Sequence, residues 1–178
     1  MIALRELKIK DAPLMLEWMH DPKIQKSFKK DMLGAKLEDT EKFIESASVS
    51  KELSTGDSVH MAIVDENDEY LGTISLKDID FDNKTAEYAI TTRAKVHGKG
   101  VAFKATGLIL EKAFEELGLH RVYLNVFSNN VAAIKLYEKS GFKFEGEFRN
   151  HLIINGEYMN WKWYGILDSE YKKSIFGL

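Results

Sequence analysis

The stretch 95–142 constrains the fold of this chain more than any other, because glycines divide it into a turn, a helix, a strand and a second helix. The turn contains Gly98-Lys99-Gly100, and the spacing of apolar residues after it predicts an amphipathic helix over 99–117. A strand is expected over 121–127 and a short helix over 130–140. Helices of this kind bury one face against a sheet, so the remaining strands must come from the rest of the chain.

The residues on either side of this stretch supply those strands. Their alternation predicts strands over 3–9, 60–64, 70–79, 85–92, 142–153 and 158–167. The last two are expected to form a hairpin across Asn155-Gly156. Helices are expected over 12–20, 23–30 and 39–53. Together these elements predict a single α+β domain over 1–178, in which helices flank a mixed, mostly antiparallel twisted sheet.

The composition argues against several classes of protein. The chain has no Cys, which excludes a disulfide framework and a cysteine nucleophile. Its formal net charge of −3, with both signs interspersed, makes nucleic acid an unexpected partner. The five histidines lack the spacing of a helical zinc site, so no metal is expected. A charge at Arg5 and the absence of a long apolar run predict a cytoplasmic protein with neither signal peptide nor membrane partner.

The glycine turn has the character of an anion site, since backbone N–H groups at a helix start bind phosphate. Two familiar phosphate-binding loops do not match it. A P-loop requires Lys-Ser/Thr after its last glycine, where Val101 stands. A dinucleotide fingerprint requires a third glycine at Phe103 and an acidic residue after the next strand, where Ser128 stands. By itself the turn is compatible with several cofactors, or with no ligand.

Two segments of this stretch together resemble the GCN5-related N-acetyltransferase superfamily. Gly98-Lys99-Gly100 matches the end of that family's Gln/Arg-x-x-Gly-x-Gly/Ala loop, although Lys95 stands where Gln or Arg is usual. Residues 130–142 match its Asn-x-x-Ala-Ile-x-Leu-Tyr-x-x-x-Gly-Phe segment. The resemblance extends over about 57–167, and the closing hairpin looks like that of ribosomal-protein N-terminal and spermidine acetyltransferases. It implies an N-acetyltransferase that holds acetyl-CoA as co-substrate between splayed central strands.

The resemblance also implies which residues form the site. The loop amides would bind the pyrophosphate, and the splayed strand would bind the pantetheine arm. The implied cofactor-binding residues are Tyr88, Ala89, Ile90, Lys95, Gly98, Lys99, Gly100, Val101, Ala102, Asn130 and Ala133. Asn130 is equally an ordinary helix-start residue. Tyr137 is the expected acid, because a phenol with a pKa near 10 still holds its proton when a thiolate with a pKa of roughly 8.5 leaves. Glu87 is the expected base.

The acceptor amine is less constrained. Trp18, His20 and Tyr158 are expected to contact a small-molecule amine between the front helices and the closing hairpin. The segment 18–22 resembles enzymes that acetylate nucleotide-linked amino sugars, the hairpin favours spermidine, and a protein N-terminus is a further candidate. Alternating Trp161 and Trp163 predict packing or a homodimer face. A catalytically silent CoA-binding relative is the alternative to an enzyme.

Overall fold

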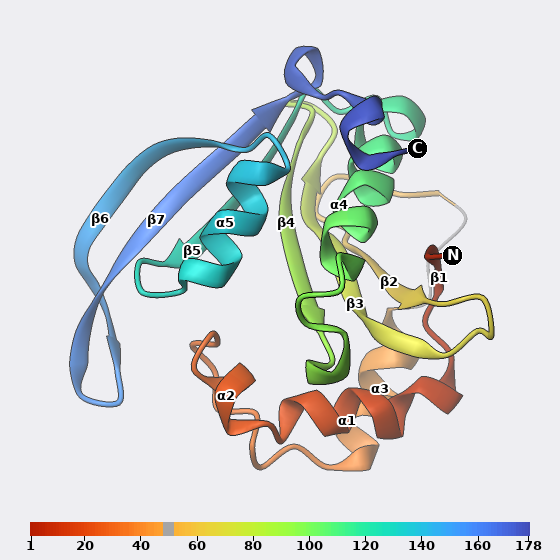
Figure 1. Cartoon of the computed structure of the whole chain (residues 1–178), viewed down its shortest axis with the longest axis vertical. Coiled ribbons are helices and arrows are strands. Elements are labelled where there is room, and N and C mark those ends of the chain that lie inside the picture. Colours follow the sequence, from red (N-terminus) through yellow and green to blue (C-terminus); the bar gives the residue numbers. More distant parts are fainter. Residues whose placement is uncertain (48–51) are drawn as a thin grey trace.

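The computed structural model describes residues 1–47 and 52–178, which form one seven-stranded sheet with helices on both faces (Figure 1). The strand order is β1-β2-β3-β4-β5-β7-β6. The strands are β1 Ala3–Glu6, β2 Val59–Val64, β3 Tyr70–Asp80, β4 Thr85–Thr92, β5 Arg121–Phe127, β6 Lys143–Ile154 and β7 Glu157–Leu167. β4 and β5 are parallel, and the other neighbouring pairs are antiparallel. The predicted mixed, mostly antiparallel sheet is therefore confirmed.

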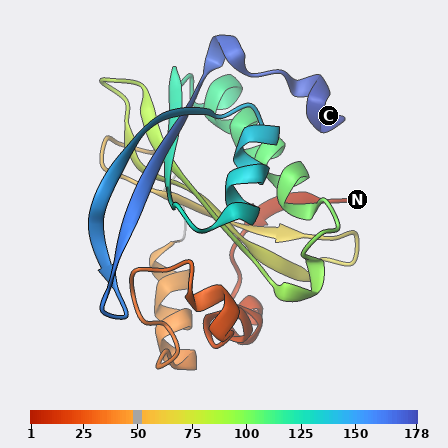
Figure 2. The same cartoon turned by 60° about the vertical axis from the view of Figure 1, so that its left-hand side comes forward.

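The helices divide between the two faces of the sheet (Figures 1 and 2). They are α1 Ala12–Met19, α2 Pro22–Gln25, α3 Leu37–Ser46, α4 Val101–Glu111, continued by a π turn at Lys112–Glu116, and α5 Val131–Lys139. Four short 3-10 turns lie at Ile9–Asp11, Ala94–Val96, Asp168–Glu170 and Lys173–Phe176. α1 and α3 pack on one core of the sheet, and α4 and α5 pack on the other.

Local hydrogen bonds explain why several elements in the front segment differ from their predicted bounds. β1 ends at Glu6, because Asp11 accepts hydrogen bonds from the Lys8 amide and from Arg5 and so turns the chain into a 3-10 helix. The second helix ends at Gln25 instead of residue 30, since the Gln25 side chain bonds the backbone of Lys30 and Met32.

The third helix begins at Leu37, two residues earlier than predicted, because the Asp39 carboxylate accepts from the Lys36 amide and caps the helix start. It ends at Ser46 instead of residue 53, and part of the predicted extension, 48–51, lies outside the described residues. The long helix predicted over 99–117 begins at Val101 and changes to a π turn at Lys112.

The two central strands separate, and this positions the site. β4 and β5 are paired only from Thr85–Glu87 to Arg121–Tyr123. Beyond that point β4 stays paired with β3 as far as Thr92, and β5 stays paired with β7 as far as Phe127. Each strand therefore keeps its outer neighbour while its inner edge opens, and Figure 1 shows them side by side at one end and apart at the other. This is the splay that the family resemblance implies.

Candidate active site

The opening between β4 and β5 presents two strand edges that face one another without pairing. Its apex is the register pair Glu87 and Tyr123. Past this pair, the inner edges of 88–92 and 124–127 have no strand partner in the described part of the chain. Unpaired strand edges bind extended ligands through backbone hydrogen bonds. The opening is thus shaped for a ligand arm that carries its own amide groups.

The glycine turn lies at the start of α4 and exposes free amide groups. Gly98 and Gly100 have φ angles of +73° and +76°, and a Cβ atom added at either would meet nothing within 4 Å. Glycine is therefore required by the backbone conformation and not by crowding. In the described residues, no backbone acceptor bonds the amides of Gly98, Gly100, Val101 or Ala102. Free donors at the start of an eleven-residue helix fit the pyrophosphate of a CoA-type cofactor.

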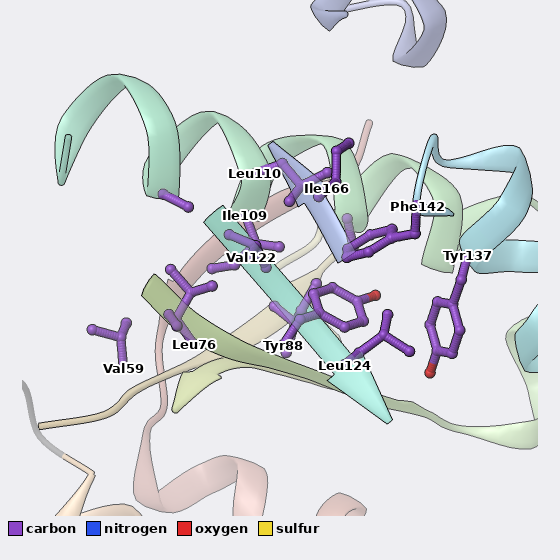
Figure 3. Close-up of a cluster of buried hydrophobic side chains, with 14 of the residues drawn as sticks. Val59, Leu76, Tyr88, Ile109, Leu110, Val122, Leu124, Tyr137, Phe142 and Ile166 are labelled. Carbon is purple, nitrogen blue, oxygen red and sulfur yellow. The ribbon is translucent and has the colours of Figure 1, made fainter. Parts of the chain in front are cut away.

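Tyr137 projects from α5 and is 8% exposed. Its ring meets Tyr88 edge-on at a centroid distance of 5.8 Å and Phe142 at 6.0 Å. Figure 3 shows its hydroxyl pointing away from both of these rings. Among residues 1–47 and 52–178, no group hydrogen-bonds this hydroxyl, and burial alone raises the pKa of Tyr137 to about 12. A protonated phenol with a free O–H is therefore held at the rim of the core.

The side chain of Tyr88 on β4 belongs to the core, unlike the half-buried side chains that follow it on the same strand. Its hydroxyl is 2.8 Å from the Thr106 hydroxyl of α4, and burial raises its pKa well above the usual value. The side chain is therefore committed to the core beneath Tyr137, and only its backbone faces the opening. Ala89 and Ile90, which follow it, are half-buried.

Glu87 is ion-paired, which the sequence did not predict. Lys77 of β3 is its register partner, and the Lys77 Nζ atom lies 2.7 Å from Glu87 Oε1. The Asn125 side-chain amide is 3.5 Å from the same oxygen. Glu87 stands at the apex of the opening, as expected for a residue beside the reacting groups, but one carboxylate oxygen is occupied by a cation.

Three other predicted cofactor residues have partners in the protein. The Lys95 ammonium is bound by Glu69, which also accepts from Arg93. Asn130 caps α5, with its side-chain oxygen 3.2 Å from the Ala133 amide, so its role as a helix-start residue is confirmed. Its contact with a cofactor, and those of Lys95 and Ala133, stay predictions. Of the turn residues, Lys99 is exposed, whereas the Val101 side chain is buried and only its amide faces outward.

On the other face of the sheet, a cavity of about 720 Å³ opens between the sheet, α1, α3 and the segment 28–35. Its walls are largely apolar, and Trp18 and Phe28 stack there at 5.6 Å. Charged side chains at its rim are Lys30, Asp31, Asp39 and Lys42. Its floor is formed by side chains of β2, β3 and β4, namely His60, Thr73, Ser75, Lys77, Ala89 and Thr91. The volume suits a small molecule, and the floor reaches the strand that borders the opening.

The three residues that were predicted to contact the substrate lie in different parts of the structure. Trp18 lines this cavity, with its indole N–H donating to the Tyr70 hydroxyl at 3.0 Å. The His20 ring nitrogen lies 2.8 Å from the Ala35 carbonyl oxygen and supports the segment that covers the cavity. Tyr158 is 68% exposed on the closing hairpin. Only Trp18 is therefore brought to the cavity wall.

The tryptophans of β7 are packed within an aromatic ladder. Trp161 stacks on His151 at 5.3 Å and lies under the Lys29 ammonium, and Trp163 stacks on Tyr123 at 6.0 Å. This accounts for both residues by packing, and the homodimer face stays a prediction.

Sequence reasoning missed the polar floor of the cavity. Thr73, Ser75 and Lys77 alternate with Ile74 and Leu76 along β3. Such alternation on a central strand, whose two faces are both covered by helices, is the signal that could have found them. Apolar side chains would be expected on both faces unless one face borders a ligand.

Two further kinds of feature are absent from the described part of the chain. Among the described residues, no helix is long and apolar enough to cross a membrane. Over the same residues, no three side chains of His, Cys, Asp or Glu converge as a metal site would require.

The sheet with its opened central strands and the glycine turn at a helix start are the features that the resemblance to N-acetyltransferases implies. A family model described as "Acetyltransferase (GNAT) domain" matches residues 2–143, and the chain belongs to this family. The predicted superfamily is therefore confirmed.

Spermidine acetyltransferases are among the relatives most similar to the chain. The spermidine N(1)-acetyltransferase of Escherichia coli K12 is 32% identical over 120 residues, which cover 67% of this chain and 64% of that enzyme. The Vibrio cholerae enzyme is 34% identical over 109 residues, which cover 61% and 63%. These alignments span slightly less than two thirds of either enzyme.

Structural similarity extends over nearly the whole chain. A crystal structure of spermidine N-acetyltransferase from Vibrio cholerae in complex with CoA and spermine has a TM-score of 0.84 and 25% identity, with 96% of this chain and 97% of that chain covered.

Proposed function

We propose that this protein is an acetyl-CoA-dependent N-acetyltransferase that acts on a primary amine of a small molecule. The observation that carries the proposal is the hydroxyl of the buried Tyr137 side chain, which has no hydrogen-bond partner among the described residues and stands on a ring packed against Tyr88 of β4, the strand that borders the opening. Membership of the GNAT family supports the donor, and the spermidine acetyltransferases among the relatives support an amine acceptor.

Two parts of the chain are proposed to bind different parts of acetyl-CoA, the acetyl donor. Amides of Gly100 and the first turn of α4 would bind the phosphates, and the inner edge of β4 would bind the pantetheine arm. Bound acetyl-CoA supplies a thioester carbonyl carbon that an amine can attack. The chain contains no Cys that could form an acyl-enzyme thioester, which favours direct transfer in a ternary complex.

Tyr137 is the proposed proton donor to the leaving sulfur. Its pKa of about 12 keeps it protonated at all physiological pH values. Complete transfer to a thiolate with a water pKa of roughly 8.5 is uphill by about 5 kcal/mol. The hydroxyl therefore acts first as a hydrogen-bond donor that stabilises the developing charge, and the proton moves as the sulfur gains charge in a buried site.

The amine must also lose a proton. An alkylamine with a pKa near 10.4 is protonated at pH 7, and making it neutral costs about 4 to 5 kcal/mol. Glu87 is the base that the sequence suggests, and its ion pair with Lys77 now weighs against that role, because proton uptake would leave the Lys77 ammonium without its partner.

An amine panel tests the proposed function. Thiol release from acetyl-CoA is measured with amino sugars, polyamines, aminoglycosides and peptide N-termini, and acetylated product is identified by mass spectrometry. The cavity of about 720 Å³ favours the small amines over a peptide N-terminus. Tight CoA binding without thiol release for any amine would instead support a catalytically silent CoA-binding relative.

A further inference from the structure

A row of three side chains crosses the sheet beneath the cavity. His60 of β2 is the register partner of Ser75 on β3, and Ser75 is the register partner of Ala89 on β4. All three line the cavity. The His60 Nδ1 atom lies 2.7 Å from Ser75 Oγ, and Ser75 is 5% exposed. A buried serine is thus hydrogen-bonded to an imidazole on a surface that is open to a ligand.

The row ends beside the opening between β4 and β5. Ala89 lies two residues past Glu87, and its small side chain leaves room above Ser75. Directly opposed residues on neighbouring strands have Cβ atoms about 5 Å apart. An amine lying over Ala89 is therefore within hydrogen-bonding reach of Ser75. Tyr137 lies on the other face of β4, packed against Tyr88.

We infer that Ser75 and His60 together receive the proton that the acceptor amine loses. The ammonium proton passes to Ser75 Oγ as the Ser75 hydroxyl proton passes to His60 Nδ1, which leaves a neutral amine, a neutral serine and an imidazolium. Acetylation of an ammonium group releases two protons. One replaces the proton that Tyr137 gives to the sulfur, and the other leaves through His60 to solvent. Ser75 faces the amine, and His60 acts through it.

The surroundings keep His60 ready to accept a proton. Burial, and then the Lys77 ammonium, lower the pKa of His60 from its usual value. The ring packs edge-on against Phe43 of α3 at 5.0 Å. The other charged groups of this cavity lie at its rim, and they are Asp39 and Lys42 from α3 and Lys30 and Asp31 from the covering segment. A neutral imidazole at pH 7 is what the relay requires.

The same geometry assigns Glu87 to a supporting role. Lys77 lies between His60 and Glu87, influences His60 electrostatically and is ion-paired with Glu87. The inference rests on the proposed function, because it concerns the amine of that reaction. The pH–rate profile distinguishes it from a mechanism in which Glu87 is the base. With a Ser75–His60 relay, variants of these two residues lose the plateau of the profile, whereas with a Glu87 base the Glu87 variant loses it.

The kinetic test measures kcat/KM from pH 6 to 9.5 with the best amine of the panel. With a protonated amine as substrate and His60 as base, the wild-type profile is flat above about pH 6.5. We expect His60→Gln and Ser75→Ala to fall at least tenfold at pH 7 and to rise about tenfold per pH unit up to pH 9, because they act only on the amine that is already neutral. Glu87→Gln should keep the plateau. His120→Gln, which alters an exposed histidine near Asp168, is the matched control and should follow the wild type.

A second measurement does not depend on turnover. Histidine ¹⁵N resonances of the wild-type protein are recorded against pH, and His60 is assigned by the signal that His60→Gln removes. We expect a neutral ring at pH 7.5 with its proton on Nε2 and a bare Nδ1 that accepts from Ser75. A ring protonated at pH 7.5, or one with its proton on Nδ1, would overturn the relay.

The outcomes separate the two proposals. If no amine gives thiol release with the wild type, the proposed function fails and the inference fails with it. If the wild type is active but His60→Gln retains the flat profile, only the relay fails. If Glu87→Gln alone converts the plateau to a rise, Glu87 is the base and the relay is wrong.

Discussion

Glu87 of β4 and Tyr123 of β5 are the last two residues that pair the central strands, and the strands part directly after them. The two faces of the sheet carry different side chains near the apex that this pair forms. On one face Tyr137 presents a buried phenol, and on the other Glu87 is ion-paired with Lys77. In the proposed mechanism Tyr137 donates a proton on one face of β4, and Ser75 and His60 accept a proton on the other face, where Lys77 and Glu87 support them. The two proton transfers would then be separated by the thickness of one strand.

The first prediction concerns Tyr137. Tyr137→Phe removes the hydroxyl and keeps the ring that packs on Tyr88 and Phe142. We expect kcat to fall about 100-fold or more, because loss of general-acid assistance costs roughly 10² to 10⁴ in rate. The Kd for CoA, measured by calorimetry, should change less than about threefold, because the proposed phosphate site is the glycine turn and not this hydroxyl.

Tyr164→Phe is the control for this prediction. Its hydroxyl donates to a Glu138 carboxylate oxygen at 3.2 Å, so it already has a partner within the protein. Loss of that hydroxyl should leave kcat within about twofold of the wild type. Equal losses in the two variants would mean that tyrosine hydroxyls act through stability and that Tyr137 has no special part.

The second prediction concerns the glycine turn. Gly100→Ala places a Cβ atom at a φ of +76°, and left-handed backbone costs a non-glycine residue roughly 1 to 2 kcal/mol. Relaxation of this strain rotates the amides at the start of α4, so we expect CoA to bind at least tenfold more weakly. Titration of CoA by calorimetry measures the change.

Gly118→Ala provides the matched comparison. Gly118 has a φ of +64°, also with open space around an added Cβ atom, and it follows the π turn at the other end of the helix. A similar loss of stability is expected, without a change in CoA affinity. If both variants bind CoA like the wild type, the amides of the glycine turn do not hold its phosphates.

The fold was largely predictable because its signals are local. Strand alternation and the Asn155-Gly156 turn place β2, β3, β4 and the closing hairpin within a few residues of their observed bounds. The exceptions lie where side chains cap the backbone, as Gln25 and Asp39 do, since such bonds depend on residues outside the helical pattern.

The site was less predictable, because it depends on which residues become neighbours. Tyr137 and the glycine turn could be named from their motifs, but the partner of Glu87 could not. Lys77 meets Glu87 only through the register of β3 and β4, and His60 meets Ser75 only through that of β2 and β3. Register is set by the whole sheet and its turns, and not by either residue.

A third prediction tests a contact that the sequence did not suggest. Phe176, from the C-terminal 3-10 turn, is 3% exposed and packs over Gly107 of α4. A Cβ atom added at Gly107 would lie 2.5 Å from Phe176 Cγ, so Gly107→Ala should lower the free energy of unfolding by about 1 to 3 kcal/mol. Phe176→Ala should lower it by about 3 to 5 kcal/mol. Urea denaturation measures both.

The double variant makes this contact specific. Phe176→Ala removes the ring atoms that would lie 2.5 and 2.8 Å from a Cβ atom at residue 107, but it keeps Phe176 Cβ, which would lie 2.7 Å away. In the Phe176→Ala background, Gly107→Ala should therefore cost clearly less than in the wild type without becoming stabilising, because part of the clash remains. Additive losses would show that the aromatic ring is not what demands glycine in α4.

The last prediction follows from the burial of the Tyr137 phenol. Burial raises its pKa in the folded protein to about 12, against about 10 in the unfolded chain. A raised pKa means that the folded state binds the proton more tightly, so this contribution to stability is complete below pH 10 and is lost as the pH rises through 12. Between pH 8 and pH 11.5 the loss from Tyr137 is about 2 kcal/mol.

Tyr137→Phe has no proton to lose at this position. Its free energy of unfolding, measured by urea denaturation, should therefore fall by about 2 kcal/mol less than that of the wild type over this pH range. Tyr158→Phe is the control, because its ring is 68% exposed and little of it is buried on folding. Equal losses in the wild type and Tyr137→Phe would place the Tyr137 hydroxyl in water, and it would then be unsuited to hold a proton for a buried leaving group.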